Sequence, residues 1–265
     1  MIRQQLNLGR KLDHDLLRRT ASCSHRSDRD ARPHFAQMHL ATTTEPALWI
    51  VDRLHPFGQD VGSIVPPGFE AHARVFHPPY RVAPDGTMTP VRWRDIAAAN
   101  ERSMQVEMRR LEISCAPAQF SRQQERLWDQ QPHCGRLPSE IADRLVTVLG
   151  RHTSTPESCW FAVWEGFGDL RVRDNPGSKF SIPGRTLILL HGHVGDLVQT
   201  LSSVDWIYLS PNLWWPEDRA WCVATEIDFT WTYVGGAPEC IQQVMDDPEL
   251  EAVPTNPAEG NCMEK

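Results

Sequence analysis

The chain has 265 residues, 40% of them hydrophobic, with ten tryptophans and nine phenylalanines. This is enough apolar material for a sizeable core, so a globular body is expected. The formal net charge is −7, but residues 1–38 hold eight basic and four acidic residues, which leaves 19 basic and 30 acidic residues, or −11, for the remainder. A body this acidic repels phosphate backbones, which argues against nucleic acid as a partner.

Cysteine usage and hydropathy bear on the compartment. The seven cysteines form an odd set without a Cys-x-x-Cys pair, and no apolar export segment precedes them. Reduced thiols in the cytoplasm are therefore expected. The longest purely apolar run, residues 187–190 (LILL), is far shorter than the roughly 20 residues that a membrane-spanning helix needs. We predict a cytoplasmic protein with no membrane partner.

Both ends of the chain are polar. Residues 1–38 are rich in Arg, Ser and Asp and contain a single aromatic residue, Phe35. A segment of this composition buries too little apolar surface to offset the entropy lost on ordering. We predict a disordered basic leader, with Met38 as an alternative start of translation. Residues 253–265 are predicted to form a flexible tail, and residues 45–252 a single α+β domain.

The first half of this domain contains two apolar segments and a helical pattern. Residues 48–54 (LWIVDRL) and 69–78 (FEAHARVFHP) predict strands, the second because its side chains alternate. A helix is predicted from Thr89 to about Pro117, because threonine is a good N-cap and a proline follows it in the first helical position. The Gln/Arg-rich stretch 119–131 is either an extension of this helix or a loop, and the region 119–135 is the candidate linker.

The clearest helix is predicted over residues 138–150. It begins with a proline, and Gly150 stands where a left-handed cap would end it. Its apolar stripe consists of Ile141, Leu145, Val148 and Leu149. The following segment, residues 159–168 (CWFAVWEGFG), carries apolar residues on both faces. This pattern is typical of a strand in the centre of a sheet.

The remaining elements follow in quick succession. A strand is predicted over residues 184–193 (GRTLILLHGH), running into a short helix. Residues 205–210 predict a further strand, residues 219–234 predict one long strand or two, and a last helix begins at Pro238. Strands and helices do not alternate regularly along the chain. We therefore predict an α+β fold with a mixed or mostly antiparallel sheet packed by about four helices.

The stretch HGHVGD at the end of the predicted strand 184–193 suggests a metal site. His191 and His193 are two residues apart, and such imidazoles can bind one divalent ion when the backbone turns between them. The stretch resembles the opening of the metallo-β-lactamase metal motif, but Gly195 and Asp196 stand where that family has Asp and His. The alternative is a strand-to-helix junction, with Asp196 in the first helical turn, where the helix dipole favours an anion.

Alternate side chains of residues 220–234 separate into two faces if the segment is a strand. One face is large and apolar and includes Trp221 and Trp231, which are predicted to be core residues. The opposite face carries Glu226 and Asp228, about 7 Å apart in a regular strand. These carboxylates could share a cation, pair with Lys or Arg, act as acid and base, or form a solvated face. The segment exceeds the usual strand length, so a bulge or bend is expected near Asp228.

Trp214 and Trp215 stand side by side in a segment predicted to be a turn, NLWWPEDRAW. Adjacent tryptophans cannot easily face the same core, so at least one is expected to be exposed. Exposed tryptophans often mark binding surfaces. The alternative is that neighbouring elements bury both.

The sequences CWFAVWEGFG and NLWWPEDRAWCVATEIDFTWTYVGG resemble a family of bacterial hypothetical proteins that carries the same motifs in this order. The resemblance spans roughly residues 137–253. It implies a bacterial origin and a shared fold, and it implies no activity, cofactor or catalytic residue. A looser similarity, in the paired helices and Trp-rich strands, is to α+β immunity modules that neutralise toxins.

These patterns favour a non-enzymatic module, without a cofactor, that binds a protein or a small-molecule ligand. The predicted binding residues are Trp214, Trp215, Glu226 and Asp228, and an acidic body suits a basic partner. The alternative is a hydrolase, around a divalent metal or without one, that combines the two histidines of HGHVGD and its aspartate with the same two carboxylates. No Gly-x-Ser-x-Gly, His-Glu-x-x-His or Gly-rich phosphate-binding motif supports a more specific enzyme class.

Overall fold

The computed structural model describes residues 38–101, 127–172 and 177–260. The α-helices in these ranges are α2 (Leu48–Val51), α3 (Trp93–Ala99), α5 (Ser139–Leu149) and α6 (Pro238–Asp246). Three short 3-10 helices are η2 (Glu45–Ala47), η3 (Val61–Ser63) and η4 (Val194–Val198). The strands are β1 (His39–Leu40), β2 (Ala71–Phe76), β3 (Tyr80–Val82), β4 (Met88–Pro90), β5 (Cys159–Trp164), β6 (Lys179–Ile182), β7 (Arg185–Gly192), β8 (Leu213–Pro216), β9 (Trp221–Ala224), β10 (Trp231–Gly236) and β11 (Ala252–Thr255).

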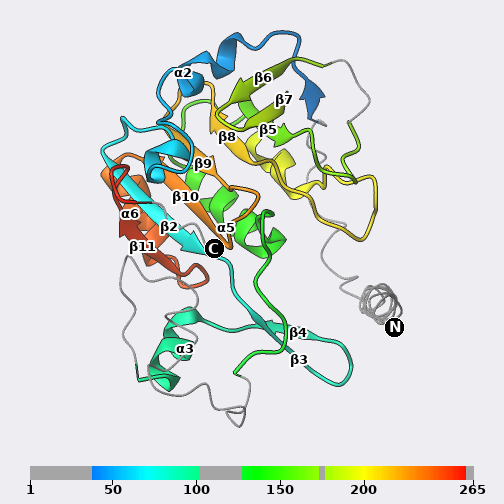
Figure 1. Ribbon diagram of the computed structural model, residues 1–265, viewed down its shortest axis with the longest axis vertical. Helices are drawn as coiled ribbons and strands as arrows, with labels where there is room; N and C mark the ends of the chain where they lie inside the picture. Colours follow the sequence, from blue (N-terminus) through cyan, green and yellow to red (C-terminus); the bar gives the residue numbers. More distant parts are fainter. Residues whose placement is uncertain (1–37, 102–126, 173–176, 261–265) are drawn as a thin grey trace, which may run out of the picture.

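Nine of these strands form one sheet. Their order is β1-β7-β5-β8-β9-β10-β2-β11, and β6 also pairs with β7. All of its strand pairs are antiparallel. The hairpin β3–β4 forms a separate small sheet, which lies with α3 beyond one end of the main sheet (Figure 1). The described residues thus contain four helices and a mostly antiparallel sheet, in agreement with the predicted α+β class.

The main sheet is covered on both faces. Phe161 and Val163 of β5 belong to a core cluster that includes the apolar residues of α5 and α6. Ala162, between them, belongs to a second cluster, together with Ile50 and Val65 from the segment that precedes β2. Successive side chains of a strand point to opposite faces, so β5 contributes to both clusters. The prediction that β5 is a central strand is confirmed, because β7 and β8 flank it.

The two helices with clear periodicity are confirmed. In α5 the predicted apolar stripe is buried, and in α6 Ile241 and Val244 are buried after the predicted start at Pro238. The left-handed cap at Gly150 is wrong, since its φ is −61°. Instead, the indole nitrogen of Trp221 donates to the carbonyl of Leu149 at 2.9 Å, which satisfies one of the acceptors that a helix end leaves open.

The strand predicted over residues 48–54 is wrong, because its first four residues form α2. Trp49 and Ile50 are buried in the second cluster from adjacent helical positions. A short apolar run does not distinguish a strand from a buried helix. Here the preceding turn decides, because η2 with Pro46 near its start already sets a helical direction for the backbone.

The helix predicted from Thr89 begins later, because Thr89 belongs to β4 and α3 starts at Trp93. The carboxylate of Glu251 accepts hydrogen bonds from the backbone nitrogens of Trp93 at 2.6 Å and Arg94 at 2.7 Å. A side chain distant in sequence therefore caps this helix, and no local pattern contains that information. The continuation of the predicted helix towards Pro117 and residues 119–126 of the predicted linker lie outside the described residues.

Two further segments differ from prediction. Residues 205–210 form a loop, and the strand that pairs with β5 is β8, which lies just after them. The predicted C-terminal tail begins too early, because β11 pairs with β2 through Thr255. The exposed edge of β2 supplies the hydrogen bonds that order this polar, proline-containing strand. The predicted leader lies outside the described ranges. Within those ranges, no helix has the length and apolar character needed to cross a membrane.

Candidate ligand-binding cleft

Trp214 and Trp215 are both buried, so the prediction that one of them is exposed is wrong. They lie in strand β8 rather than in a turn, and they point to opposite faces of the sheet. Trp214 packs edge to face on Trp221, with ring centroids 5.0 Å apart, and Trp215 packs in the same way on Trp49 at 6.1 Å. Two adjacent tryptophans are buried because the sheet has a core on each side, and they form no exposed binding surface.

The segment 219–234 forms two strands, with a break between β9 and β10. Trp221 and Trp231 are buried as predicted, but in different core clusters. The break changes the parity of the side chains, so positions that would share one face of a regular strand lie on opposite faces. The loop at this break, residues 225–230, carries Glu226 and Asp228.

Arg185, the first residue of β7, binds both of these carboxylates. Its Nη2 lies 2.6 Å from Oε1 of Glu226 and 3.2 Å from Oδ2 of Asp228. The arginine side chain is 16% exposed, whereas the aspartate side chain is 70% exposed. The sequence left several arrangements of Glu226 and Asp228 open. The structure contains the one in which both carboxylates pair with a basic residue, Arg185.

Two aromatic rings complete the surroundings of this guanidinium. Cζ of Arg185 lies 5.1 Å from the ring centroid of Phe57 and 5.8 Å from that of Trp164. The four residues Phe57, Trp164, Glu226 and Asp228 are called the cage below. Three of them, Phe57, Trp164 and Glu226, line a narrow cleft together with Arg185, and this cleft holds about 20 Å³ of open space. The lining residues besides these four are Ser63, Ile64, Ile182, Leu187, Asn212, Leu213, Ala224, Thr225 and Ile227.

Asn212 holds two parts of the cleft together. Its side-chain oxygen accepts from the backbone nitrogen of Trp164 at 2.8 Å, and its side-chain nitrogen donates to the carbonyl of Thr225 at 3.0 Å. The backbone of Asn212 also accepts from the nitrogen of Thr225 at 2.7 Å. These bonds connect the end of β5, which carries one cage ring, to the start of the loop that carries the cage carboxylates.

The loop of residues 225–230 also contacts residues that precede α5. The nitrogen of Gly135 donates to the carbonyl of Phe229 at 2.8 Å, and Gly135 has a φ of +73°. A Cβ atom at this position would lie only 2.1 Å from the carbonyl oxygen of Ile227. Glycine is therefore required here by the backbone conformation and by the close approach of the loop.

The electrostatics of the cleft are not fully balanced. Burial raises the pKa of the Glu226 carboxyl, and the hydrogen bond from Arg185 offsets only part of this effect. Nε of Arg185 is buried and has no hydrogen-bond partner among the described residues. One guanidinium between two ionised carboxylates leaves a net charge of −1, which is most accessible at Asp228.

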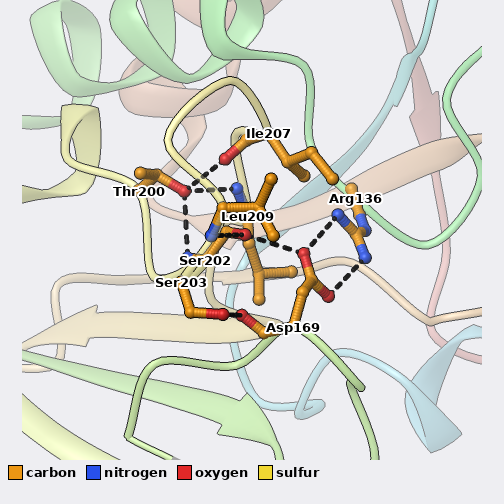
Figure 2. Close-up of polar contacts among 8 residues, drawn as sticks. Arg136, Asp169, Thr200, Ser202, Ser203, Ile207 and Leu209 are labelled. Carbon is orange, nitrogen blue, oxygen red and sulfur yellow. Dashed lines mark hydrogen bonds and ion pairs between the residues drawn. The ribbon is translucent and has the colours of Figure 1, made fainter. Parts of the chain in front are cut away.

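A second arginine–aspartate pair shows the contrast with a saturated cluster (Figure 2). Arg136 binds Asp169 in a bidentate manner, with distances of 2.8 and 3.1 Å, and Ser202 donates to the same carboxylate at 2.8 Å. Burial favours a higher pKa for Asp169, but the bonds from Arg136 and Ser202 outweigh it and hold the pKa below its usual range. This cluster joins three loops, and its geometry indicates a structural role.

The three candidate metal ligands, His191, His193 and Asp196, bind different groups of the protein. Nδ1 of His193 accepts from the nitrogen of Gly195 at 2.8 Å, and Asp196 accepts from the nitrogen of His193 at 2.9 Å, so both cap η4. His191 instead approaches Ser158, with 3.0 Å between Nε2 and Oγ. The alternative interpretation as a strand-to-helix junction thus describes this stretch. No group of three or more His, Cys, Asp or Glu residues within the described ranges is arranged to hold a metal ion.

The histidines are also remote from the acidic loop. Arg185, which binds the loop, begins β7, and His191 lies six residues later in the same strand. At the rise of an extended strand this separation is about 20 Å. The fold therefore does not bring His191 together with Glu226 and Asp228, as the combined site of the hydrolase alternative requires.

Comparisons with known proteins assign neither a family nor a function to this chain. None of the protein-family models, curated proteins or solved structures that were compared matches this chain. The role of the cleft residues therefore has to follow from their geometry. Sequence patterns found the carboxylates but missed Phe57, Trp164 and Arg185. The local sequence around Arg185 shows only that it follows a glycine, Gly184, at the turn that leads into β7.

Proposed function

We propose that the protein is a non-enzymatic binding module and that its ligand presents a cationic group to the cleft at Arg185. The observation that carries this proposal is that the 70% exposed carboxylate of Asp228 and the 38% exposed ring of Phe57 both contact the guanidinium of Arg185, in a group of one guanidinium and two carboxylates with a net charge of −1. Carboxylates and aromatic faces are the groups that attract ammonium and guanidinium ions.

The size of the cleft limits what it takes. With Arg185 among its lining residues, the cleft holds about 20 Å³ of open space, far less than a drug-sized molecule needs, so the ligand would place no more than the tip of a side chain or a head group there. The remainder of such a ligand would lie outside the cleft. A basic side chain of a protein partner satisfies this condition, and the charge of −11 on residues 39–265 favours the approach of a basic partner.

Binding can be tested with N-acetyl-arginine amide and with N-acetyl-citrulline amide, which has a similar shape but no charge. Titrations followed by amide chemical shifts of the full chain are expected to show saturable binding of the arginine compound, with shifts around residues 225–230. Asp228→Asn is expected to weaken binding several-fold, because it removes the accessible charge. Asp205→Asn is the matched control, because this aspartate is 93% exposed and lies near Arg171 rather than in the cage around Arg185.

Two results would contradict the proposal. One is equal binding of the charged and uncharged compounds, which would show that charge is not recognised. The other is an equal loss of binding in the Asp228 and Asp205 variants, which would show that only the overall charge of the protein matters.

A further inference from the structure

The cage already holds a cation, and that cation belongs to the protein. The guanidinium of Arg185 contacts all four cage residues: it lies over the rings of Phe57 and Trp164, and its Nη2 binds the carboxylates of Glu226 and Asp228. A planar guanidinium suits such a site better than an ammonium ion does, because it stacks on aromatic rings while its edges donate to carboxylates. The internal occupant therefore indicates which chemical group the cage fits.

Arg185 is nevertheless an imperfect occupant. Its Nη1 donates to the carbonyl of the preceding residue, Gly184, at 3.0 Å, and its Nε is buried without a hydrogen-bond partner among the described residues. A buried donor that has lost its water and gained no acceptor is unfavourable. The tether to β7 explains the defect, because the backbone determines the direction from which this side chain enters the cage.

The position of Arg185 also allows its side chain to leave. It is the first residue of β7 and pairs with Ile182 at the turn of the β6–β7 hairpin, where Gly184 has a φ of +79°. The strand pairing of β7 involves backbone atoms, so a change of side-chain rotamer does not break it. Phe57 and Asp228 are the two exposed cage residues, so the guanidinium has contacts on the solvent side of the cage as well as with the buried Glu226.

We infer that Arg185 is a displaceable internal ligand and that the cage binds the guanidinium group of an arginine side chain or of a small guanidino compound in its place. This inference rests on the proposed function and adds the chemical class of the ligand and the residue that competes with it. When Arg185 leaves, two carboxylates and two rings remain without their internal cation, and an external guanidinium restores the contacts. Binding and displacement are thus coupled.

This coupling has a consequence that simple charge recognition does not share. A ligand that must displace Arg185 binds with an affinity reduced by the small fraction of molecules in which the cage is open. Removing the arginine side chain removes this competition. Arg185→Ala is therefore expected to bind guanidinium compounds more tightly than the unmodified protein, even though the charge of the protein changes by only one unit.

The experiment compares the unmodified chain, Arg185→Ala and Arg185→Gln by calorimetric titration with methylguanidinium and, as an uncharged control, methylurea. Arg185→Ala is expected to bind methylguanidinium at least roughly tenfold more tightly than the unmodified chain, and to gain thermal stability from it but not from methylurea. Arg219→Ala is the matched control, because Arg219 lies over the ring of Trp49, 5.5 Å from its centroid and outside the cleft. It should bind as the unmodified chain does.

The source of the guanidinium group is resolved by a second titration, with a blocked Gly-Arg-Gly peptide. Tighter binding of the peptide than of methylguanidinium assigns the cage to a protein side chain, and equal binding assigns it to a small guanidino compound. If Arg185→Ala does not fold without ligand, Arg185→Gln, which keeps most of the side chain, serves for the affinity comparison. Refolding of the alanine variant by methylguanidinium and not by methylurea would also support the inference.

The outcomes separate the two proposals. If the unmodified chain binds N-acetyl-arginine amide in an Asp228-dependent manner but neither Arg185 variant binds methylguanidinium more tightly, displacement is wrong and the proposed function stands. If the variants bind and the unmodified chain does not, the cage recognises guanidinium but the proposed function of the natural chain is overturned. An absence of binding to all three chains overturns both.

Discussion

Trp214 and Trp221 pack edge to face in the same core cluster, 5.0 Å between centroids and 75° between ring planes, but their indole nitrogens differ. Nε1 of Trp221 donates to the carbonyl of Leu149 at the end of α5, whereas Nε1 of Trp214 has no hydrogen-bond partner among the described residues. The two rings therefore have similar packing and unequal polar contributions. This difference gives a matched pair of substitutions.

We expect Trp221→Phe to lower the free energy of unfolding by about 1–2 kcal/mol more than Trp214→Phe does. Both substitutions remove part of a buried ring, but only the first removes a hydrogen bond to the carbonyl of Leu149, which keeps the bond from the backbone nitrogen of His152 at 3.0 Å. Urea unfolding followed by circular dichroism measures the difference. Equal losses in the two variants would show that the hydrogen bond to Leu149 contributes nothing to stability.

Truncation of the adjacent tryptophans tests their burial directly. Trp214→Ala and Trp215→Ala are each expected to lower the free energy of unfolding by about 3–5 kcal/mol, because each leaves a large cavity in one of the two cores. Thermal melts of the single variants are sufficient. Trp206→Ala is the control, since this side chain is 60% exposed and should cost much less. Nearly unchanged melting of the two core variants would contradict the fold described above.

We expect His77 to make the protein sensitive to acid. Its Nδ1 lies 2.7 Å from the carbonyl of His133, which can only accept, so Nδ1 carries the proton and Nε2 accepts from Thr232 at 2.9 Å. The ring is fully buried, and this burial lowers the pKa of His77 from 6.5 to about 4. Below the pKa of the unfolded chain, unfolding takes up a proton that the folded protein does not bind.

The contribution of His77 to stability is therefore complete above pH 6.5 and is lost as the pH falls towards 4. A shift of this size corresponds to about 3 kcal/mol. Urea unfolding at a series of pH values should show this loss, and His77→Gln, which cannot titrate, should show a smaller pH dependence. The pKa values of His72 and His133 are also lowered by burial, so a residual slope is expected in the variant. An unchanged slope would contradict the assignment to His77.

Gly135 is expected to control the position of the acidic loop. In Gly135→Ala the new Cβ would collide with the carbonyl of Ile227, and the residue would keep a positive φ, so a loss of roughly 1–3 kcal/mol is expected together with a displaced loop. Unfolding measurements and amide shifts of residues 225–230 report the two effects. Gly168→Ala is the control, because a Cβ at Gly168 would meet no atom within 4 Å. Similar losses in both variants would contradict the close approach.

The described cysteines are expected to differ sharply in reactivity. Cys134 is exposed, whereas Cys159, Cys222 and Cys240 are buried, and burial raises the pKa of the Cys159 and Cys240 thiols to about 12. Because the thiolate is the reactive form, iodoacetamide at pH 8 should modify Cys134 in the native protein and the other three only after unfolding. Peptide mapping by mass spectrometry identifies each site. Rapid native modification of Cys222 would contradict its place in the second core cluster.

Sequence patterns were reliable where a long periodic segment faces a single core. The apolar stripe of α5 and the double-sided apolar pattern of β5 predicted these elements, because side-chain burial repeats with the period of the backbone. They were unreliable for short elements whose state depends on distant partners. The start of α3 is set by Glu251, and β11 exists because the edge of β2 is free to pair with it.

The candidate site was predicted only in part, for a related reason. The sequence pointed to Glu226 and Asp228 and anticipated a bend near them, since a segment of this length rarely continues as one strand. It did not indicate that the partner of both carboxylates is Arg185, about forty residues earlier, or that Phe57 lies against the same guanidinium. The pairing of distant segments depends on the register of the sheet, which no local pattern records.

By itself, the sequence determined the acidic body, the α+β class and the helices with strong periodicity, because composition and burial period are properties of consecutive residues. The tertiary structure alone decided that Trp214 and Trp215 belong to two opposite cores, and that Arg185 lies among two carboxylates and two rings. Whether a side chain is exposed, paired or enclosed depends on what the rest of the chain places against it. The cage exists only because β5, β7 and the loops before β2 and β10 meet at one end of the sheet.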